Sequence, residues 1–230
     1  MPVPRTLNHD FFKKWGPEMA YVLGFFAADG CMIQSNRGSH FIEFHITDRE
    51  ILIAIRRVLK SNHKISVRVR KNPKHKVGYR IQIGSKEMYH DLQALGMSSR
   101  KSLTLRMPDI PSKYFGHFVR GYFDGDGCVY FKKHHAKDRK KPRYVFATRF
   151  TCGSRPFVAS LLTMLRRRGL QKGFILEKQN TAYELVFSHH DSVALYRIMY
   201  DTLGDSDIYL SRKYKLFTHA IETLYGKMRA

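Results

Sequence analysis

The sequence predicts an α+β fold of two pseudo-symmetric halves, each with the element order αββαββα. The first observation is a segment that occurs twice, as YVLGFFAADGC at residues 21–31 and as FVRGYFDGDGC at residues 118–128. The second is that later features recur in the same order, including Ser-Arg-Lys at 99–101 and again at 211–213. Because the offset between the two copies only grows along the chain, we interpret the sequence as a duplicated domain with loop insertions. The predicted halves are residues 1–110 and 111–230.

Each half is expected to begin with a helix that ends at an Asp-Gly pair, over residues 18–28 in the first half and 114–125 in the second. Two strand pairs follow, each with a helix after it. Thr47 and Glu50 have the spacing of a capping box at the start of the next helix. Ser154 has the residue type of an N-cap, so it opens the equivalent helix of the second half.

Short runs of alternating residues predict strands with one buried face. In residues 65–71, Val67 and Val69 share one face, and the residues between and beside them are serine and arginine. Residues 79–83 alternate in the same way. Helices that cover the apolar face of each sheet would leave a long, polar and positive face free for binding.

The charge of the chain indicates a polyanionic partner. The net charge is +22 over 230 residues, and the sequence pI is about 10.1. A surplus of this size repels itself in a compact protein, and nucleic acid or an acidic membrane surface would neutralise it. With 43% hydrophobic residues, the chain is too apolar to be a disordered basic tail.

Several classes of protein are excluded by the same reading. The three cysteines are odd in number and form no CxxC pair, which argues against a disulfide framework and against a zinc finger. No run approaches the roughly 18 apolar residues that a membrane span needs. The first residues lack the pattern of a secretory signal. We therefore expect a protein that stays inside the cell, in a prokaryotic cytoplasm or an organelle, with no membrane partner.

Two aspartates stand at unfavourable positions. Asp29 and Asp126 fall in the last turn of the two predicted helices, where the helix dipole is already negative. Gly30 and Gly127 after them suit the left-handed conformation that often ends a helix. Since a carboxylate in that turn is destabilising, we expect a divalent cation to compensate for both.

Small residues on each helix predict how these carboxylates come together. Gly24 and Ala28 lie four residues apart on one face of the first helix, and Gly121 and Gly125 do so on the second. Such faces allow two helices to pack backbone against backbone. That packing would bring the two acidic helix ends close to each other.

The segments 22–30 and 119–127 resemble the LAGLIDADG motif, and the whole chain resembles a single-chain LAGLIDADG homing endonuclease. The resemblance implies that the two motif helices form the central interface and that the sheets form a DNA-binding saddle. It implies that Asp29 and Asp126 bind metal, with the backbone carbonyls of Ala28 and Gly125 as further ligands. The first motif departs from the pattern in having alanine at position 27, where the second has aspartate.

The resemblance also implies the reaction and further site residues. The expected protein is a monomeric, intron-encoded enzyme that makes a double-strand break in a long, asymmetric DNA site. Mg²⁺ is the expected cofactor; Mn²⁺ or Ca²⁺ is expected to substitute for it in binding, and Ca²⁺ is not expected to support cleavage. Lys101 and Lys213 match the basic residue near each site, and Asp48 and Ser154 match a residue that positions water. The last two have an N-cap as their alternative role.

Side chains that alternate away from the core are expected to contact DNA, because the major groove accepts a β-ribbon. These candidates are Ile33, Ser35, Arg37, Arg68, Arg70, Arg80 and Gln82 in the first half, and Tyr130, Lys132, His134 and Arg149 in the second. An alternative function remains open, in which the same scaffold binds nucleic acid without cleaving it, as an intron RNA maturase or a DNA-binding regulator. Retention of both aspartates and both lysines favours the nuclease.

Overall fold

The computed structural model describes residues 5–69, 76–99, 101–135, 143–178, 182–204 and 207–226. The elements of the first half are α1 (Pro17–Asp29), β1 (Gly30–Gln34), β2 (His40–Ile46), α2 (Arg49–Val58), β3 (Ile65–Arg68), β4 (Gly78–Gly84), α3 (Lys86–Ala94) and α4 (Lys101–Thr104). Those of the second half are η1 (Ser112–Tyr114), α5 (Phe115–Asp126), β5 (Gly127–His134), β6 (Arg143–Cys152), α6 (Arg155–Arg166), β7 (Phe174–Lys178), β8 (Ala182–Ser188), α7 (His189–Tyr200) and α8 (Ser211–Tyr225).

This element order confirms the predicted α+β fold and its repeat. Each half contains one antiparallel sheet of four strands, in the order β1-β2-β4-β3 and β5-β6-β8-β7. Each half also contains one helix beyond the predicted order, the single-turn α4 and the 15-residue α8. The boundary predicted at 110/111 lies between α4 and η1 and stays a prediction.

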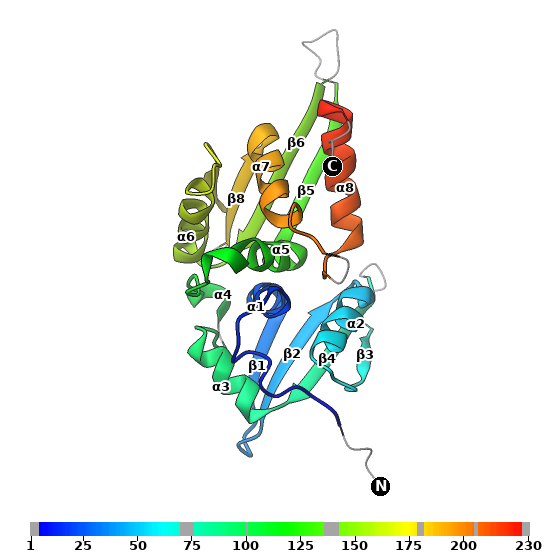
Figure 1. Cartoon of the computed structure of the whole chain (residues 1–230), viewed down its shortest axis with the longest axis vertical. Helices are drawn as coiled ribbons and strands as arrows, with labels where there is room; N and C mark the ends of the chain where they lie inside the picture. The colour runs from blue at the N-terminus through cyan, green and yellow to red at the C-terminus, as the bar shows by residue number, and fades with distance from the viewer. Residues whose placement is uncertain are drawn as a thin grey trace.

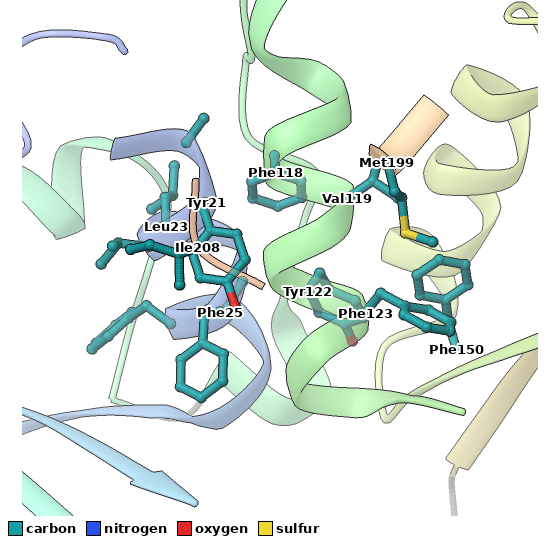
Figure 2. Close-up of a cluster of buried hydrophobic side chains, with 14 of the residues drawn as sticks. Tyr21, Leu23, Phe25, Phe118, Val119, Tyr122, Phe123, Phe150, Met199 and Ile208 are labelled. Atoms are coloured by element: carbon teal, nitrogen blue, oxygen red, sulfur yellow. The ribbon is translucent and has the colours of Figure 1, made fainter. Parts of the chain in front are cut away.

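The helices α1 and α5 lie side by side at the centre of the molecule, and the two sheets extend away from them in opposite directions (Figure 1). The core runs through this junction. Apolar side chains from both central helices meet there, including Tyr21 and Phe25 of α1 and Phe118 and Tyr122 of α5 (Figure 2). The halves therefore share one core instead of folding around two separate ones.

Alternation along the strands separates a core face from an open face in each sheet. In β2, Ile42, Phe44 and Ile46 are buried in the core, and Glu43 and His45 point to the other face. Among the described residues, no helix has the length and hydropathy needed to cross a membrane.

Two details of the predicted helix ends are wrong. Gly30 and Gly127 are extended, with φ of −87° and −89°, and not left-handed. Glycine is needed there for space, because a Cβ at either position would collide with the phenyl ring four residues earlier, that of Phe26 or Phe123. The capping box at Thr47 is also absent, since the N-cap of α2 is the next residue and its side chain makes no capping bond.

Candidate active site at the ends of the central helices

The central helices contact each other backbone to backbone, as the small residues predict. A Cβ on Gly24 would collide with the carbonyl oxygen of Phe118, and a Cβ on Gly121 would collide with that of Tyr21. A Cβ on Gly125 would collide with the side chain of Ala28. The C-terminal ends of α1 and α5 are therefore held together by contacts that no larger residue permits.

The two repeated carboxylates meet at this point. Asp29 and Asp126 are the last residues of α1 and α5, and both are partly exposed. The position of a Cβ built on Gly125 is 3.2 Å from Oδ2 of Asp29, so the carboxylate of one helix lies against the end of the other. No hydrogen bond or ion pair to either carboxylate occurs within the described parts of the chain.

Burial raises the pKa of both carboxylates, because it disfavours their charged form. Burial, and then the neighbouring charge of Asp126, raise the pKa of Asp29 to about 7. Burial also raises the pKa of Asp126, while Lys101 and Lys213 act in the opposite direction. Two half-buried acids without partners at one place are a candidate site for a cation.

Two buried lysines contact the ends of the same helices. Lys101 is 5% exposed, and its Nζ donates to the carbonyl oxygen of Ala28 over 3.3 Å. Lys213 is 6% exposed, and its Nζ donates to the carbonyl oxygens of Phe123, Asp124 and Gly125 over 2.7, 2.8 and 3.2 Å. Their ammonium groups therefore offset the negative ends of the helix dipoles, a role that the sequence had assigned to a metal ion alone.

The two lysines are held unequally, which predicts unequal contributions to stability. We expect Lys213→Met to lower the free energy of unfolding by about 2 kcal/mol more than Lys101→Met, because Lys213 donates to three carbonyl groups and Lys101 to one; of the three, that of Phe123 still accepts the backbone N–H of Gly127 in the variant. Chemical denaturation of the two variants measures the difference. Equal losses would show that the shorter bonds of Lys213 do not stabilise the helix end.

Asp48 forms an ion pair that joins the two halves. The guanidinium of Arg212 donates to both carboxylate oxygens of Asp48, Nε to Oδ1 over 2.8 Å and NH2 to Oδ2 over 2.8 Å. This bond holds the pKa of Asp48 below its usual value. Because Arg212 precedes Lys213, the pair also fixes the start of α8 next to the carboxylates.

Ser154, its counterpart in the repeat, has a different role. Its side chain is buried; Oγ donates to the carbonyl oxygen of Leu105 over 2.6 Å and accepts the backbone N–H of Phe157 over 3.5 Å. Of the two roles that the sequence left open, the geometry therefore gives Ser154 that of N-cap.

Sequence reasoning missed Asp124. This residue is fully buried, and its Oδ2 accepts from the hydroxyl of Tyr21 over 2.7 Å and from the backbone N–H of Leu210 over 2.8 Å. Burial raises its pKa to about 6. Asp124, on α5, therefore forms hydrogen bonds both to α1 and to the segment that precedes Lys213. The signal was available in the departure from the repeat, since Ala27 stands at the equivalent position.

A second missed residue, Arg120, anchors the same segment. Arg120 is fully buried on α5, and it donates to the carbonyl oxygens of Ile208 and Met199 over 3.0 and 2.8 Å. It also forms an ion pair with Asp207 at 3.1 Å. The segment that carries Lys213 to the site is therefore fixed by both Arg120 and Asp124.

The open faces of the sheets carry most of the residues expected to contact DNA. In the N-terminal sheet, Ile33, Arg68, Arg80 and Gln82 lie at open-face positions of the strand register. Ser35 and Arg37 lie in the turn between β1 and β2, and Arg70 lies outside the described residues. The predicted residues of the C-terminal sheet share its open face, and these are Tyr130, Lys132, His134 and Arg149.

Two acids on these faces were not expected. Glu43 accepts an ion pair from Arg80 at 3.5 Å, and Glu184 accepts one from Arg149 at 3.7 Å and another from Lys178 at 3.4 Å. Each sheet thus orients an arginine with a carboxylate on the same face. An ion pair of this kind favours some conformations of a long side chain over others before any ligand binds.

The carboxylates do not form a complete metal cage by themselves. Within the ranges that the structure describes, no group of three or more His, Cys, Asp or Glu side chains is arranged to hold a metal ion. A cation at Asp29 and Asp126 would therefore need further oxygen atoms to complete its coordination, from water, from a ligand, or from the carbonyls of Ala28 and Gly125, which accept from Lys101 and Lys213 here.

Comparisons with known proteins agree with this geometry. Residues 16–95 match the model of a LAGLIDADG-like domain. Comparison of the sequence with curated proteins gives no significant match.

Among solved structures, the chain is similar to the meganuclease I-AabMI bound to uncleaved DNA, with a TM-score of 0.59, 15% identity, and coverage of 91% of this chain and 90% of that one. It is similar to the homing endonuclease I-LtrWI bound to target DNA, with a TM-score of 0.58, 12% identity, and coverage of 94% and 92%. It is also similar to I-SmaMI bound to cleaved DNA, with a TM-score of 0.56, 13% identity, and coverage of 89% and 87%. The chain therefore contains a LAGLIDADG-like domain in its first half and has, over most of its length, the fold of the LAGLIDADG homing endonucleases.

Proposed function

We propose that this protein is a site-specific endonuclease that hydrolyses both strands of a long, asymmetric duplex DNA target with the help of divalent metal ions. One observation carries the proposal: Asp29 and Asp126, half-buried and with no hydrogen-bond or ion-pair partner among the described residues, meet at the ends of two helices that glycines hold in backbone contact. A protein that only binds nucleic acid gains nothing from two adjacent carboxylates that repel each other.

The donor atoms at this place fit a hard divalent cation. Mg²⁺ is usually held by one or two carboxylates together with waters and substrate phosphates, which is the donor set that Asp29 and Asp126 offer. When bound, Mg²⁺ supplies an activated water and neutralises charge on the phosphate. We expect Mn²⁺ to replace it, and Ca²⁺ to support binding without cleavage.

The side chains around the carboxylates have separable roles. Lys101 and Lys213 place positive charge beside the acids, where the phosphate gains negative charge during hydrolysis. Asp48 fixes Arg212 at the start of α8. The basic open faces of the two sheets hold the duplex on both sides of the centre. Since the duplication supplies both carboxylates in one chain, a monomer suffices to cut both strands.

The likeness to structures that contain DNA supports duplex DNA as the ligand. The structures of I-AabMI and I-LtrWI have this fold and are bound to DNA. The net charge of +22 fits the same partner. A location inside the cell with the DNA of the host, and a coding sequence within an intron, belong to the same proposal.

Selection from a randomised duplex library tests this function. The purified protein is incubated with the library and Mg²⁺, and the cleaved molecules are sequenced. We expect one long asymmetric site, cut on both strands, with no cleavage in Ca²⁺ or in a metal chelator. Selective binding without cleavage in either Mg²⁺ or Mn²⁺ would favour the non-cleaving alternative and refute the nuclease.

A further inference from the structure

The C-terminal sheet exposes apolar side chains on its outer strand, β7. Phe174 and Leu176 of β7 are 52% and 40% exposed. Their neighbour Val186 on β8 is buried but lies outside the core cluster. We call these three residues the β7 patch.

Strand register places the β7 patch on the open face. Phe174 is opposite Val186, Val186 is opposite Arg149, and Arg149 is opposite Cys128. Directly opposite residues of neighbouring strands point to the same face of a sheet. These directly opposite residues form a row across the sheet that starts at Cys128, two residues after Asp126, and ends at Phe174 in the β7 patch. The intervening Ile175 packs against the core instead.

The N-terminal sheet presents different chemistry at the matching positions. The row that begins at Cys31 continues through Glu43 and Gln82, which are both polar. Its outer strand β3 adds Ser66 and Arg68 to the open face. At these matching positions the N-terminal sheet is thus polar and the C-terminal sheet is apolar at its outer strand, although Ile33 also lies on the open face of the N-terminal sheet.

The surroundings of the β7 patch point to a polyanion with an apolar feature. Arg149 and Lys178 lie on the same face, and the one acid between them, Glu184, is paired with both. A duplex supplies negative charge from its phosphates, and the C5-methyl group of thymine is the apolar feature in its major groove. Because two cations share that single carboxylate, positive charge remains in excess, and a purely apolar protein surface would not neutralise it.

We infer that the β7 patch determines specificity by contacting thymine methyl groups in the half of the DNA site that lies on the C-terminal sheet. The inference rests on the proposed binding of duplex DNA but not on cleavage. Arg80 and Gln82 of the N-terminal sheet would instead form hydrogen bonds to base edges. The two half-sites would therefore be recognised by different kinds of contact.

Deoxyuridine tests this inference because it differs from thymidine only by the missing methyl group. Duplexes are first selected by binding in Ca²⁺, and thymines in the C-terminal half-site are then replaced one at a time. At the positions under the patch, we expect each replacement to weaken binding about fourfold, the effect of exposing one buried methyl-sized group. Replacements in the N-terminal half-site should have smaller effects.

Variants then connect the effect to the patch. Phe174→Ala and Leu176→Ala should bind thymine and deoxyuridine duplexes equally well, because the contacting surface is gone. Both side chains are exposed, so thermal melting should be unchanged. Val67→Ala is the matched control: Val67 is 61% exposed on the outer strand of the other sheet but is opposite Tyr79, whose side chain packs against the core. It should retain the full preference for thymine.

The outcomes separate this inference from the proposed function. Sequence-selective binding with equal sensitivity to deoxyuridine in wild type and Phe174→Ala would overturn the inference alone. A concentration-dependent dimer that dissociates in Phe174→Ala would also overturn it, because a second copy would then cover the patch. Absence of any sequence-selective binding to duplex DNA would refute the proposed function as well.

Discussion

Asp29→Asn is expected to abolish cleavage of both strands, to preserve DNA binding, and to raise the melting temperature of the metal-free protein. Cleavage is lost because asparagine removes one of the two carboxylates that would hold the metal ions. Stability rises because burial, and then the neighbouring charge of Asp126, raise the pKa of Asp29 to about 7 in the folded protein, and asparagine carries no charge to bury.

The sign of the stability effect follows from linkage. The pKa of Asp29 is higher in the folded than in the unfolded chain, so its ionisation costs stability as the pH rises from about 4 through 7. Asparagine cannot ionise, so the gain should be present at pH 8 and absent at pH 3. The rise of this pKa from 3.8 to about 7 corresponds to at most about 4 kcal/mol, or up to about ten degrees in melting temperature for a chain of this size.

Calorimetry at the two pH values, together with strand-resolved cleavage, measures this prediction. Asp10→Asn is the matched control, because Asp10 is an exposed acid far along the chain from the central helix ends, paired with Lys13. It should leave cleavage unchanged. If Asp29→Asn lowered the melting temperature or prevented DNA binding, the carboxylate would be structural and not a metal ligand.

Gly121→Ala is expected to destabilise the protein severely. A Cβ at this position would collide with the carbonyl oxygen of Tyr21 and approach the backbone nitrogen of Phe25 to 2.9 Å. Backbone cannot move aside as a flexible side chain can, so α1 and α5 would have to separate. Overpacking of a core costs about 1–3 kcal/mol, and more where the helices must part. The whole shared core, and the approach of Asp29 to α5, depend on that contact.

Thermal unfolding followed by circular dichroism measures the loss. Gly16→Ala is the control, because Gly16 is the N-cap of α1, is extended, and has no atom within 4 Å of the position of an added Cβ. Its cost should remain below about 1 kcal/mol, the size of an N-cap effect. A melting temperature for Gly121→Ala within two or three degrees of wild type, about 1 kcal/mol for this chain length, would show that the helices are not in obligatory backbone contact.

Local patterns explain why so much of this arrangement could be predicted from the sequence. The repeat located both aspartates, and the spacing of Gly24 and Gly121 predicted which helix faces meet. Successive side chains of a strand point to opposite faces of the sheet, and this alternation does not depend on the rest of the fold. The sequence therefore placed Gln82 and Arg149 on the open faces correctly.

Contacts between distant residues explain what could not be predicted. Lys213 caps a helix end 88 residues earlier, and Arg212 binds an aspartate 164 residues earlier. No local pattern encodes these pairs. The glycines after the aspartates were predicted for the wrong physical reason. Gly30 and Gly127 do not adopt a left-handed conformation; glycine is required because the rings of Phe26 and Phe123 leave no space for a Cβ.

The departure from the repeat proved as informative as the repeat itself. Asp124 and Ala27 occupy equivalent positions, and only the aspartate binds Tyr21 and the segment before α8. The two helix ends therefore carry the same carboxylates, Asp29 and Asp126, but differ in the number of hydrogen bonds that their lysines form.

The central claim is that Asp29 and Asp126 bind the metal ions of a DNA hydrolase. Anomalous diffraction from Mn²⁺ in crystals of the protein with its selected duplex tests it most directly. The account predicts anomalous peaks in contact with the carboxylate oxygens of both residues and with phosphate oxygens of the DNA. Mn²⁺ bound elsewhere, or ordered DNA with no Mn²⁺ at either carboxylate, would contradict it.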